Sequence, residues 1–233
     1  MSAFLLIHGA GDVGWSWHLV GAELRARGHE VFAPDLPGGD GTQGFADYAD
    51  AVVAEVGELH DLVVVGHSMG AFTAPILAER LSADVLVLLA GMIPSPGESP
   101  DEWWTRTGCG DAVAAAAERD GGLTGNEDPF VSFYHDVPRE LAEEAMSKER
   151  AHPSSAAMAA PWPLAEWPRV STKYIVCTED RFFPPEFLRA LALERLGVVA
   201  DDITGSHCVP LSRPVELAVM LEGYAAEARS GRE

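Results

Sequence analysis

Lysine and cysteine are both scarce in this chain of 233 residues. Only two lysines are present, and Lys+Arg total 16 against 36 Asp+Glu, so the formal net charge is −20 at pH 7. A strongly acidic surface repels phosphate backbones and anionic lipid headgroups. The composition therefore argues against nucleic-acid binding and against binding to a membrane surface.

The three cysteines, Cys109, Cys177 and Cys208, form no CxxC pair and are odd in number. They indicate neither a zinc knuckle nor a disulfide framework. No apolar run approaches the ~20 residues that a membrane-spanning helix needs, and no basic segment precedes an apolar stretch long enough for secretion. These features predict a soluble, cytoplasmic protein.

Short apolar runs alternate with helical patterns along most of the chain. The expected strands are Phe4–Ile7, Glu30–Ala33, Leu62–Gly66, Val85–Ala90, Tyr174–Cys177 and Val198–Ile203. The expected helices are Trp15–Arg27, Phe45–Leu59, Gly70–Leu81, Glu186–Leu196 and Pro214–Ala228. Such alternation is typical of βαβ units, and near-continuous apolar strands are typical of a sheet covered on both faces. The sequence predicts an α/β fold with a mostly parallel sheet of about six strands.

One long segment, residues 92–169, contains no convincing strand and begins with a run rich in Pro, Gly and Ser. Helical patterns follow at Asp111–Arg119 and Arg139–Ala151. So long an excursion from a compact domain favours a helical lid over a structureless loop. We therefore expect residues 1–91 and 170–233 to form the core, with 92–169 as an inserted lid. A surface insertion without a role in the site is the alternative.

The most informative segment is residues 62–71, LVVVGHSMGA. An apolar strand runs into G-x-S-x-G and a helical pattern begins at once, which is the order of a nucleophile elbow. In that turn the serine adopts a strained backbone conformation, and Gly66 and Gly70 keep Cβ atoms out of the crowded space. Ser68 is therefore the predicted nucleophile, with an ordinary tight turn as the alternative.

A serine nucleophile needs a base, and the base needs an acceptor that orients it. In this architecture the chain order is Ser, then Asp or Glu, then His. Of the eight histidines, His207 follows the last expected strand in a loop, and it is the predicted base. Asp180 follows the Tyr174–Cys177 strand and is favoured over Glu179 because a shorter carboxylate can be held more rigidly. The alternative is that both carboxylates are solvated loop residues.

An oxyanion hole needs two preorganised backbone N–H groups, one of them from the residue after the nucleophile. Met69 occupies that position. The loop after the first strand should supply the other donor, and Ala10 is the predicted one because its neighbouring glycines allow a close approach to substrate. The same glycines could instead serve only a tight turn.

Several short motifs follow one another along the chain in the order that is typical of one enzyme family. They are LLIHGA at 5–10, GWSWH at 14–18, PDLPG at 34–38, GHSMG at 66–70, CTED at 177–180, PEF at 185–187 and GSH at 205–207. Together they resemble the α/β-hydrolase superfamily, and within it the branch of plant methyl-ester esterases and hydroxynitrile lyases with their bacterial relatives. The resemblance covers almost the whole chain. It implies the triad Ser68–Asp180–His207 and oxyanion donors at Ala10 and Met69.

Two positions depart from the lyases of that branch. The lyases carry a threonine where this chain has Gly9 and a lysine where it has Cys208. A lyase needs a cation to stabilise the leaving cyanide, and a cysteine supplies none at neutral pH. The pattern is therefore that of the esterases. Asp12 stands where many relatives have a different polar residue, which leaves the substrate preference near the oxyanion loop open.

The sequence predicts a serine carboxylesterase that acts on a small, largely apolar ester without a metal or organic cofactor. Its partner would be that small molecule, and the chain could form a homodimer. Candidate pocket residues are Gly9, Trp15, Trp104, Phe130 and Phe133. Two alternatives remain. The same triad could catalyse acyl transfer or another pathway-specific reaction, such as cyclisation, lactone opening or C–C cleavage. The chain could also be a binding protein with the hydrolase fold. For Cys208 we expect packing, with a reactive thiol of lowered pKa as the alternative.

Overall fold

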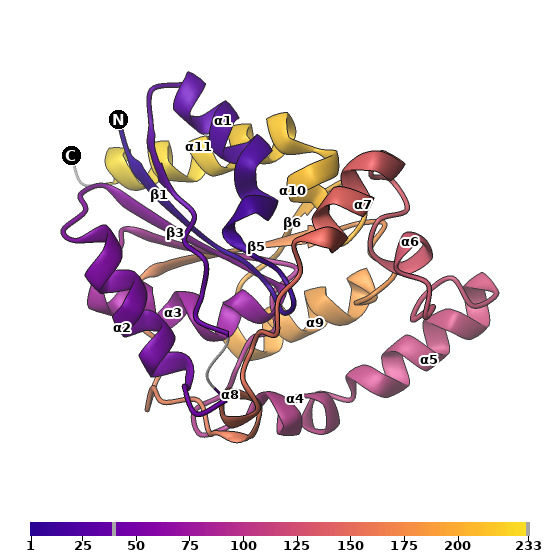
Figure 1. Cartoon of the computed structure of the whole chain (residues 1–233). Helices are drawn as coiled ribbons and strands as arrows, with labels where there is room; N and C mark the ends of the chain where they lie inside the picture. Colours follow the sequence, from indigo (N-terminus) through magenta and orange to yellow (C-terminus); the bar gives the residue numbers. More distant parts are fainter. Residues whose placement is uncertain (39–40, 232–233) are drawn as a thin grey trace.

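The computed structural model describes residues 1–38 and 41–231, and their strands form one parallel sheet (Figure 1). The strands are β1 (Ala3–Ile7), β2 (Glu30–Phe32), β3 (Leu62–His67), β4 (Val85–Leu89), β5 (Ser171–Cys177) and β6 (Asp201–Ile203). Their order is β2-β1-β3-β4-β5-β6, and every neighbouring pair is parallel. The predicted α/β fold is confirmed. The sixth strand begins at Asp201, three residues later than expected.

Helices cover both faces of this sheet, as predicted from its apolar strands. The covering helices are α1 (His18–Ala26) and α11 (Pro214–Ser230) on one face, and α2 (Phe45–Val56), α3 (Ala74–Arg80) and α9 (Pro185–Leu196) on the other (Figure 1). Every residue of β1, β3 and β4 is buried between the two layers. Short 3-10 turns, η1 (Gly14–Trp17) and η2 (Ser68–Phe72), precede α1 and α3, so both α-helices begin later than the sequence predicted.

Residues 92–169, all within the described part of the chain, join β4 to β5 through helices and contain no strand. The helices are α4 (Pro100–Arg106), α5 (Cys109–Asp120), α6 (Pro129–Ser132), α7 (Arg139–Ser147) and α8 (Ser155–Ala159). Helices α5 and α7 match the two expected ones, although α7 ends at Ser147 rather than Ala151. Helices α6 and α7 lie on the side of the molecule toward which the carboxyl ends of the strands point (Figure 1). The division into a core of residues 1–91 and 170–233 and an inserted lid stays a prediction. Residues 232–233 of that core lie outside the described residues.

Helix α4 was not predicted, although its start carries a clear signal. The Ser99 side chain accepts a hydrogen bond from the Glu102 amide, and the Glu102 carboxylate accepts one from the Ser99 amide. This capping box, followed by a proline at the first helical position, is a known beginning of a helix. The preceding Pro- and Gly-rich run obscured it. None of the helices in the described residues is long and apolar enough to cross a membrane.

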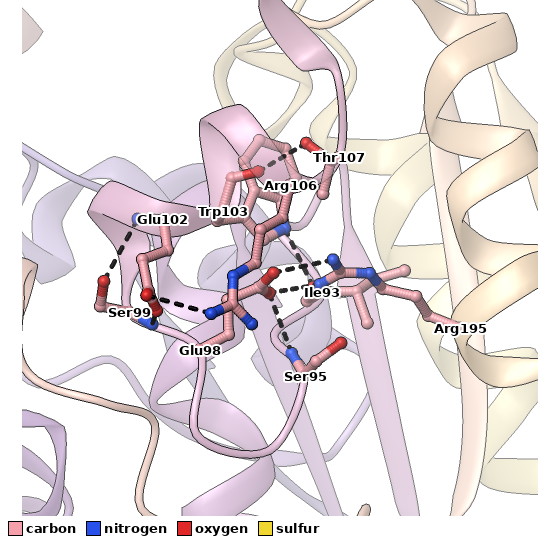
Figure 2. Close-up of polar contacts among 9 residues, drawn as sticks. All are labelled: Ile93, Ser95, Glu98, Ser99, Glu102, Trp103, Arg106, Thr107 and Arg195. Atoms are coloured by element: carbon pink, nitrogen blue, oxygen red, sulfur yellow. Dashed lines mark hydrogen bonds and ion pairs between the residues drawn. The ribbon is translucent and has the colours of Figure 1, made fainter.

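A buried ion pair fastens the first residues of the 92–169 insertion to α9 (Figure 2). The Glu98 side chain is 1% exposed and the Arg195 side chain 14%. Arg195 Nη2 donates to Glu98 Oε1 over 2.9 Å, and Arg195 Nη1 donates to Glu98 Oε2 and to the Ile93 carbonyl. The Ser95 amide also donates to the Glu98 carboxylate. A carboxylate with this many donors is well compensated for its burial.

We expect Glu98→Gln to lower the free energy of unfolding by about 3 kcal/mol, because it leaves the Arg195 charge buried without its counterion. Urea denaturation measures the effect as a shift in midpoint. The exposed pair Arg139–Glu143 provides the control, since Glu143→Gln should change stability by less than about 0.5 kcal/mol. Equal shifts for the two variants would contradict the prediction.

Candidate active site

Ser68 lies in the sharp turn between β3 and η2, and its backbone is strained. Its φ is +52°, a left-handed conformation that costs a non-glycine residue free energy. The two neighbouring glycines are required by close packing. A Cβ at Gly66 would lie 2.6 Å from the Ala74 Cβ, and one at Gly70 would lie 2.6 Å from the His8 carbonyl oxygen. The turn therefore has the backbone that the sequence predicted for a nucleophile elbow.

The structure places Asp180 and His207 in direct contact. His207 Nδ1 lies 2.7 Å from Asp180 Oδ2, and both side chains are almost fully buried. The other carboxylate oxygen, Oδ1, accepts hydrogen bonds from the Phe182 and Phe183 amides at 2.8 and 2.9 Å. Asp180 is thus fixed by three donors, which makes it a firm acceptor for the imidazole.

Glu179, the alternative acid, is exposed, and the carboxylate paired with His207 in the described residues is that of Asp180. Its amide donates to the Gly205 carbonyl, and its carbonyl accepts a hydrogen bond from His135 of the insertion. These backbone bonds hold the loop in which Asp180 turns inward. The choice of Asp180 over Glu179 therefore agrees with the geometry.

Ser68 and His207 meet in a cavity of about 130 Å³ at the carboxyl ends of β1 and β3. The cavity is lined by Gly9, Ala10, Gly11, Asp12, His67, Ser68, Phe133, Tyr134, Glu149, Phe182, His207 and Cys208. Within the described residues no hydrogen bond joins Ser68 to His207. Such bonds are often long before substrate binds. No group of three or more metal-ligating side chains gathers in the described part of the chain.

Of the five candidate pocket residues, Gly9 and Phe133 line this cavity, whereas Trp15, Trp104 and Phe130 do not. The aromatic side chains of these three pack elsewhere. Trp104 contacts the rings of Phe182 and Phe183, Trp15 stacks on His18, and Phe130 lies under the Arg139 guanidinium. All three side chains are half-buried and pack against the hydrophobic core clusters rather than the cavity.

Of the two predicted oxyanion donors, Ala10 lines the cavity and Met69 follows Ser68 in the chain. Met69 lies in the first turn of η2, directly after Ser68, where backbone N–H groups have no partner within the helix. Ala10 lines the cavity and is exposed, and its amide makes no hydrogen bond within the described residues. A Cβ on Gly9 would come within 3.0 Å of the Ser68 Cβ. The glycine therefore allows the first loop to approach Ser68 closely.

His8 braces the loop that carries Ala10. Its Nδ1 lies 2.9 Å from the Gly9 carbonyl, and its Nε2 accepts a hydrogen bond from the Leu36 amide. Burial lowers the pKa of His8, so the ring is neutral with its proton on Nδ1. This arrangement fixes the loop before any substrate arrives.

His67 has a role that sequence reasoning missed. It cannot serve as the base, but its Nε2 lies 2.9 Å from the His207 carbonyl, and the two rings are 4.8 Å apart. Burial, together with the neighbouring His207, lowers the pKa of His67 well below its usual value. A neutral His67 therefore donates to the His207 backbone and steadies the loop. The only signal in the sequence was its place beside Ser68.

The surroundings of Cys208 disfavour the thiolate form of its side chain. Burial and the nearby carboxylates of Asp12 and Asp180 raise the pKa of Cys208 well above its usual value. This environment opposes the lowered pKa of the alternative interpretation. The thiol packs in the cavity wall as an uncharged group.

Comparisons with known proteins are consistent with this geometry. The chain matches the family described as "Alpha/beta hydrolase family" over residues 4–219. It is 28% identical to Esterase PIR7B of Oryza sativa subsp. japonica, over 94% of this chain and 93% of that protein. It is 26% identical to Methylesterase 7 of Arabidopsis thaliana, over 94% of each. The solved structure of polyneuridine aldehyde esterase is similar, with a TM-score of 0.75 and 23% identity, covering 97% of this chain and 99% of that one. The predicted resemblance to the branch of plant methyl-ester esterases is confirmed.

Proposed function

The chain belongs to the alpha/beta hydrolase family, and on this premise we propose that it is a serine carboxylesterase with the triad Ser68–His207–Asp180. The observation that carries the proposal is the 2.7 Å contact between His207 Nδ1 and Asp180 Oδ2, beside a cavity that Ser68 shares with His207. An imidazole oriented in this way has Nε2 available as a base. The esterase and methylesterase names of the relatives support this activity.

Acylation begins when His207 Nε2 takes the Ser68 hydroxyl proton and Oγ attacks the ester carbonyl. The carbonyl oxygen becomes an oxyanion, which the Ala10 and Met69 amides stabilise. Asp180 stabilises the imidazolium that forms. The C–O bond to the alcohol then breaks, and His207 returns its proton to the departing alcohol. The product of this half-reaction is an acyl ester on Ser68.

Deacylation repeats the same steps with water. His207 Nε2 takes a proton from the water molecule, whose oxygen attacks the acyl carbonyl. The bond to Ser68 Oγ breaks, and the proton on His207 restores the serine hydroxyl. The carboxylic acid leaves, and the enzyme returns to its initial state.

The size and lining of the cavity support a small ester as substrate. About 130 Å³ is a small volume for a ligand pocket. Phe133 and Phe182 present apolar rings beside His207, at centroid distances of 5.5 and 5.2 Å. A short acyl chain would contact these rings.

The proposal is tested with p-nitrophenyl acetate and a fluorophosphonate that phosphonylates activated serines. We expect catalytic release of p-nitrophenol and one adduct per chain, located on Ser68 by mass spectrometry of the digested protein. Denatured protein, in which the turn and the base are lost, serves as the control and should give no adduct. A folded chain that neither releases p-nitrophenol nor forms the adduct would overturn the proposal.

A further inference from the structure

The cavity beside Ser68 has two chemically different walls. Phe133 and Phe182 form an aromatic wall, whereas Asp12 and Glu149 add carboxylates to the lining. Asp12 is half-buried, and Glu149 is exposed. Such a combination of aromatic faces and carboxylates is suited to a cation.

Neither carboxylate has a cationic partner within the described residues. The two basic residues that flank Glu149 in the sequence have other partners. Lys148 pairs with Glu144 and lies over the Trp15 ring, and Arg150 pairs with Asp35. The Asp12 side chain accepts a hydrogen bond from the Val13 amide, which fixes its orientation without neutralising its charge. No Lys or Arg of the described residues therefore pairs with these carboxylates, and for Asp12 the nearby His207 and the Ser16 hydroxyl offset the charge only in part.

The position of Asp12 matters because Ala10, two residues earlier, is a proposed oxyanion donor. Both residues line the same cavity. A negative charge close to a developing oxyanion opposes its formation. A positive charge on the substrate would compensate the carboxylate and remove this cost in the transition state.

We infer that this site prefers esters that carry a positively charged ammonium group close to the scissile bond, with Asp12 as the main residue that recognises the charge and Glu149 as a second one at the cavity entrance. The inference rests on the proposed esterase function and specifies its substrate class. Burial and the neighbouring Glu149 raise the pKa of Asp12 to about 6, so the carboxylate is still mainly ionised at pH 8. The formal net charge of −20 also favours the approach of cationic ligands.

The test uses two esters of the same shape, of which only one is charged. These are acetylcholine and 3,3-dimethylbutyl acetate, in which a carbon atom replaces the quaternary nitrogen. We measure kcat/KM for both at pH 8 and low ionic strength. The wild-type protein should prefer the choline ester by about tenfold, a difference of ~1.4 kcal/mol. This preference should decrease as salt screens the charges.

Variants assign the preference to the two carboxylates. Asp12→Asn keeps the oxygen that accepts the Val13 hydrogen bond and should reduce the ratio of the two kcat/KM values to about one. Glu149→Gln should reduce it partly, because an exposed charge is more strongly screened. Glu127→Gln, which removes an exposed carboxylate that does not line the cavity, makes the same change in net charge and should leave the ratio unchanged.

Either of two results would overturn the inference while leaving the esterase proposal in place: a wild-type ratio near one, or a ratio that Asp12→Asn does not change. Failure of the esterase proposal is recognised separately, because Ser68 then forms no fluorophosphonate adduct. If Ser68 forms the adduct but neither ester is hydrolysed, choline and 3,3-dimethylbutanol are compared as inhibitors of adduct formation. Choline should protect about tenfold better, and equal protection by the two would contradict the inference.

Discussion

Ser68→Ala should reduce kcat for ester hydrolysis about a million-fold, the size of loss that follows removal of the nucleophile from a serine triad. The variant cannot form the acyl-enzyme, and only the oxyanion donors and substrate binding remain. Hydrolysis of p-nitrophenyl acetate and the absence of a fluorophosphonate adduct measure the effect. A variant that keeps more than a hundredth of the activity would exclude Ser68 as the nucleophile.

Stability measurements separate this loss from misfolding. An alanine at this position would adopt the same left-handed backbone as Ser68, whose φ is +52°, so Ser68→Ala should unfold at nearly the same urea concentration as the wild type. Ser68→Gly is the matched variant. It should be more stable than Ser68→Ala by about 0.5 to 1 kcal/mol, because glycine adopts this conformation without strain. Equal stability of the two would show that the turn is unstrained.

Asp180→Asn should reduce kcat about 10⁴-fold without a large change in KM. The reason lies in the hydrogen bonds of the carboxylate. Oδ1 accepts from the Phe182 and Phe183 amides, so an asparagine must place its oxygen there and its NH2 group toward His207 Nδ1. The imidazole then accepts at Nδ1 and carries its proton on Nε2. In that tautomer Nε2 cannot take the serine proton.

The neighbouring carboxylate supplies a matched control for this variant. Glu179→Gln removes the same charge one residue earlier, but the side chain is exposed and only the backbone of Glu179 makes hydrogen bonds to the site loops. Its kcat should stay within about twofold of the wild type, since an exposed charge is strongly screened. A loss of similar size in both variants would mean that charge, rather than the orientation of His207, governs the rate.

The order of the strands and of the helices that cover the sheet could be predicted from hydrophobic patterns alone. Strands buried on both faces are apolar throughout, and β1, β3 and β4 are of this kind. Element boundaries were less accurate where local geometry intervenes. Helix α3 begins at Ala74 rather than Gly70 because the nucleophile turn first forms η2. Helix α4 was missed because Pro100, its first residue, is typical of a loop unless the capping box before it is recognised.

The candidate pocket shows the limit of sequence reasoning more clearly. Trp104 and Phe133 both lie in the 92–169 insertion and are both large aromatic residues. Of these two, only Phe133 lines the cavity, whereas Trp104 packs against Phe182 and Phe183. Which of two aromatic rings faces a cavity depends on how separate helices pack, and no local pattern records it.

The sequence by itself determined the fold class and the candidates Ser68, Asp180 and His207, because apolar strands, the G-x-S-x-G turn and the order of the loops that follow can be recognised along the chain. Tertiary structure decided the rest. Packing brought two loops of the core together so that Asp180 contacts His207, and it placed Asp12 and Glu149, from loops far apart in sequence, in one cavity. The electrostatic potential that these two carboxylates create in the cavity depends on their burial and on their distances from the site, which are defined only in the folded chain.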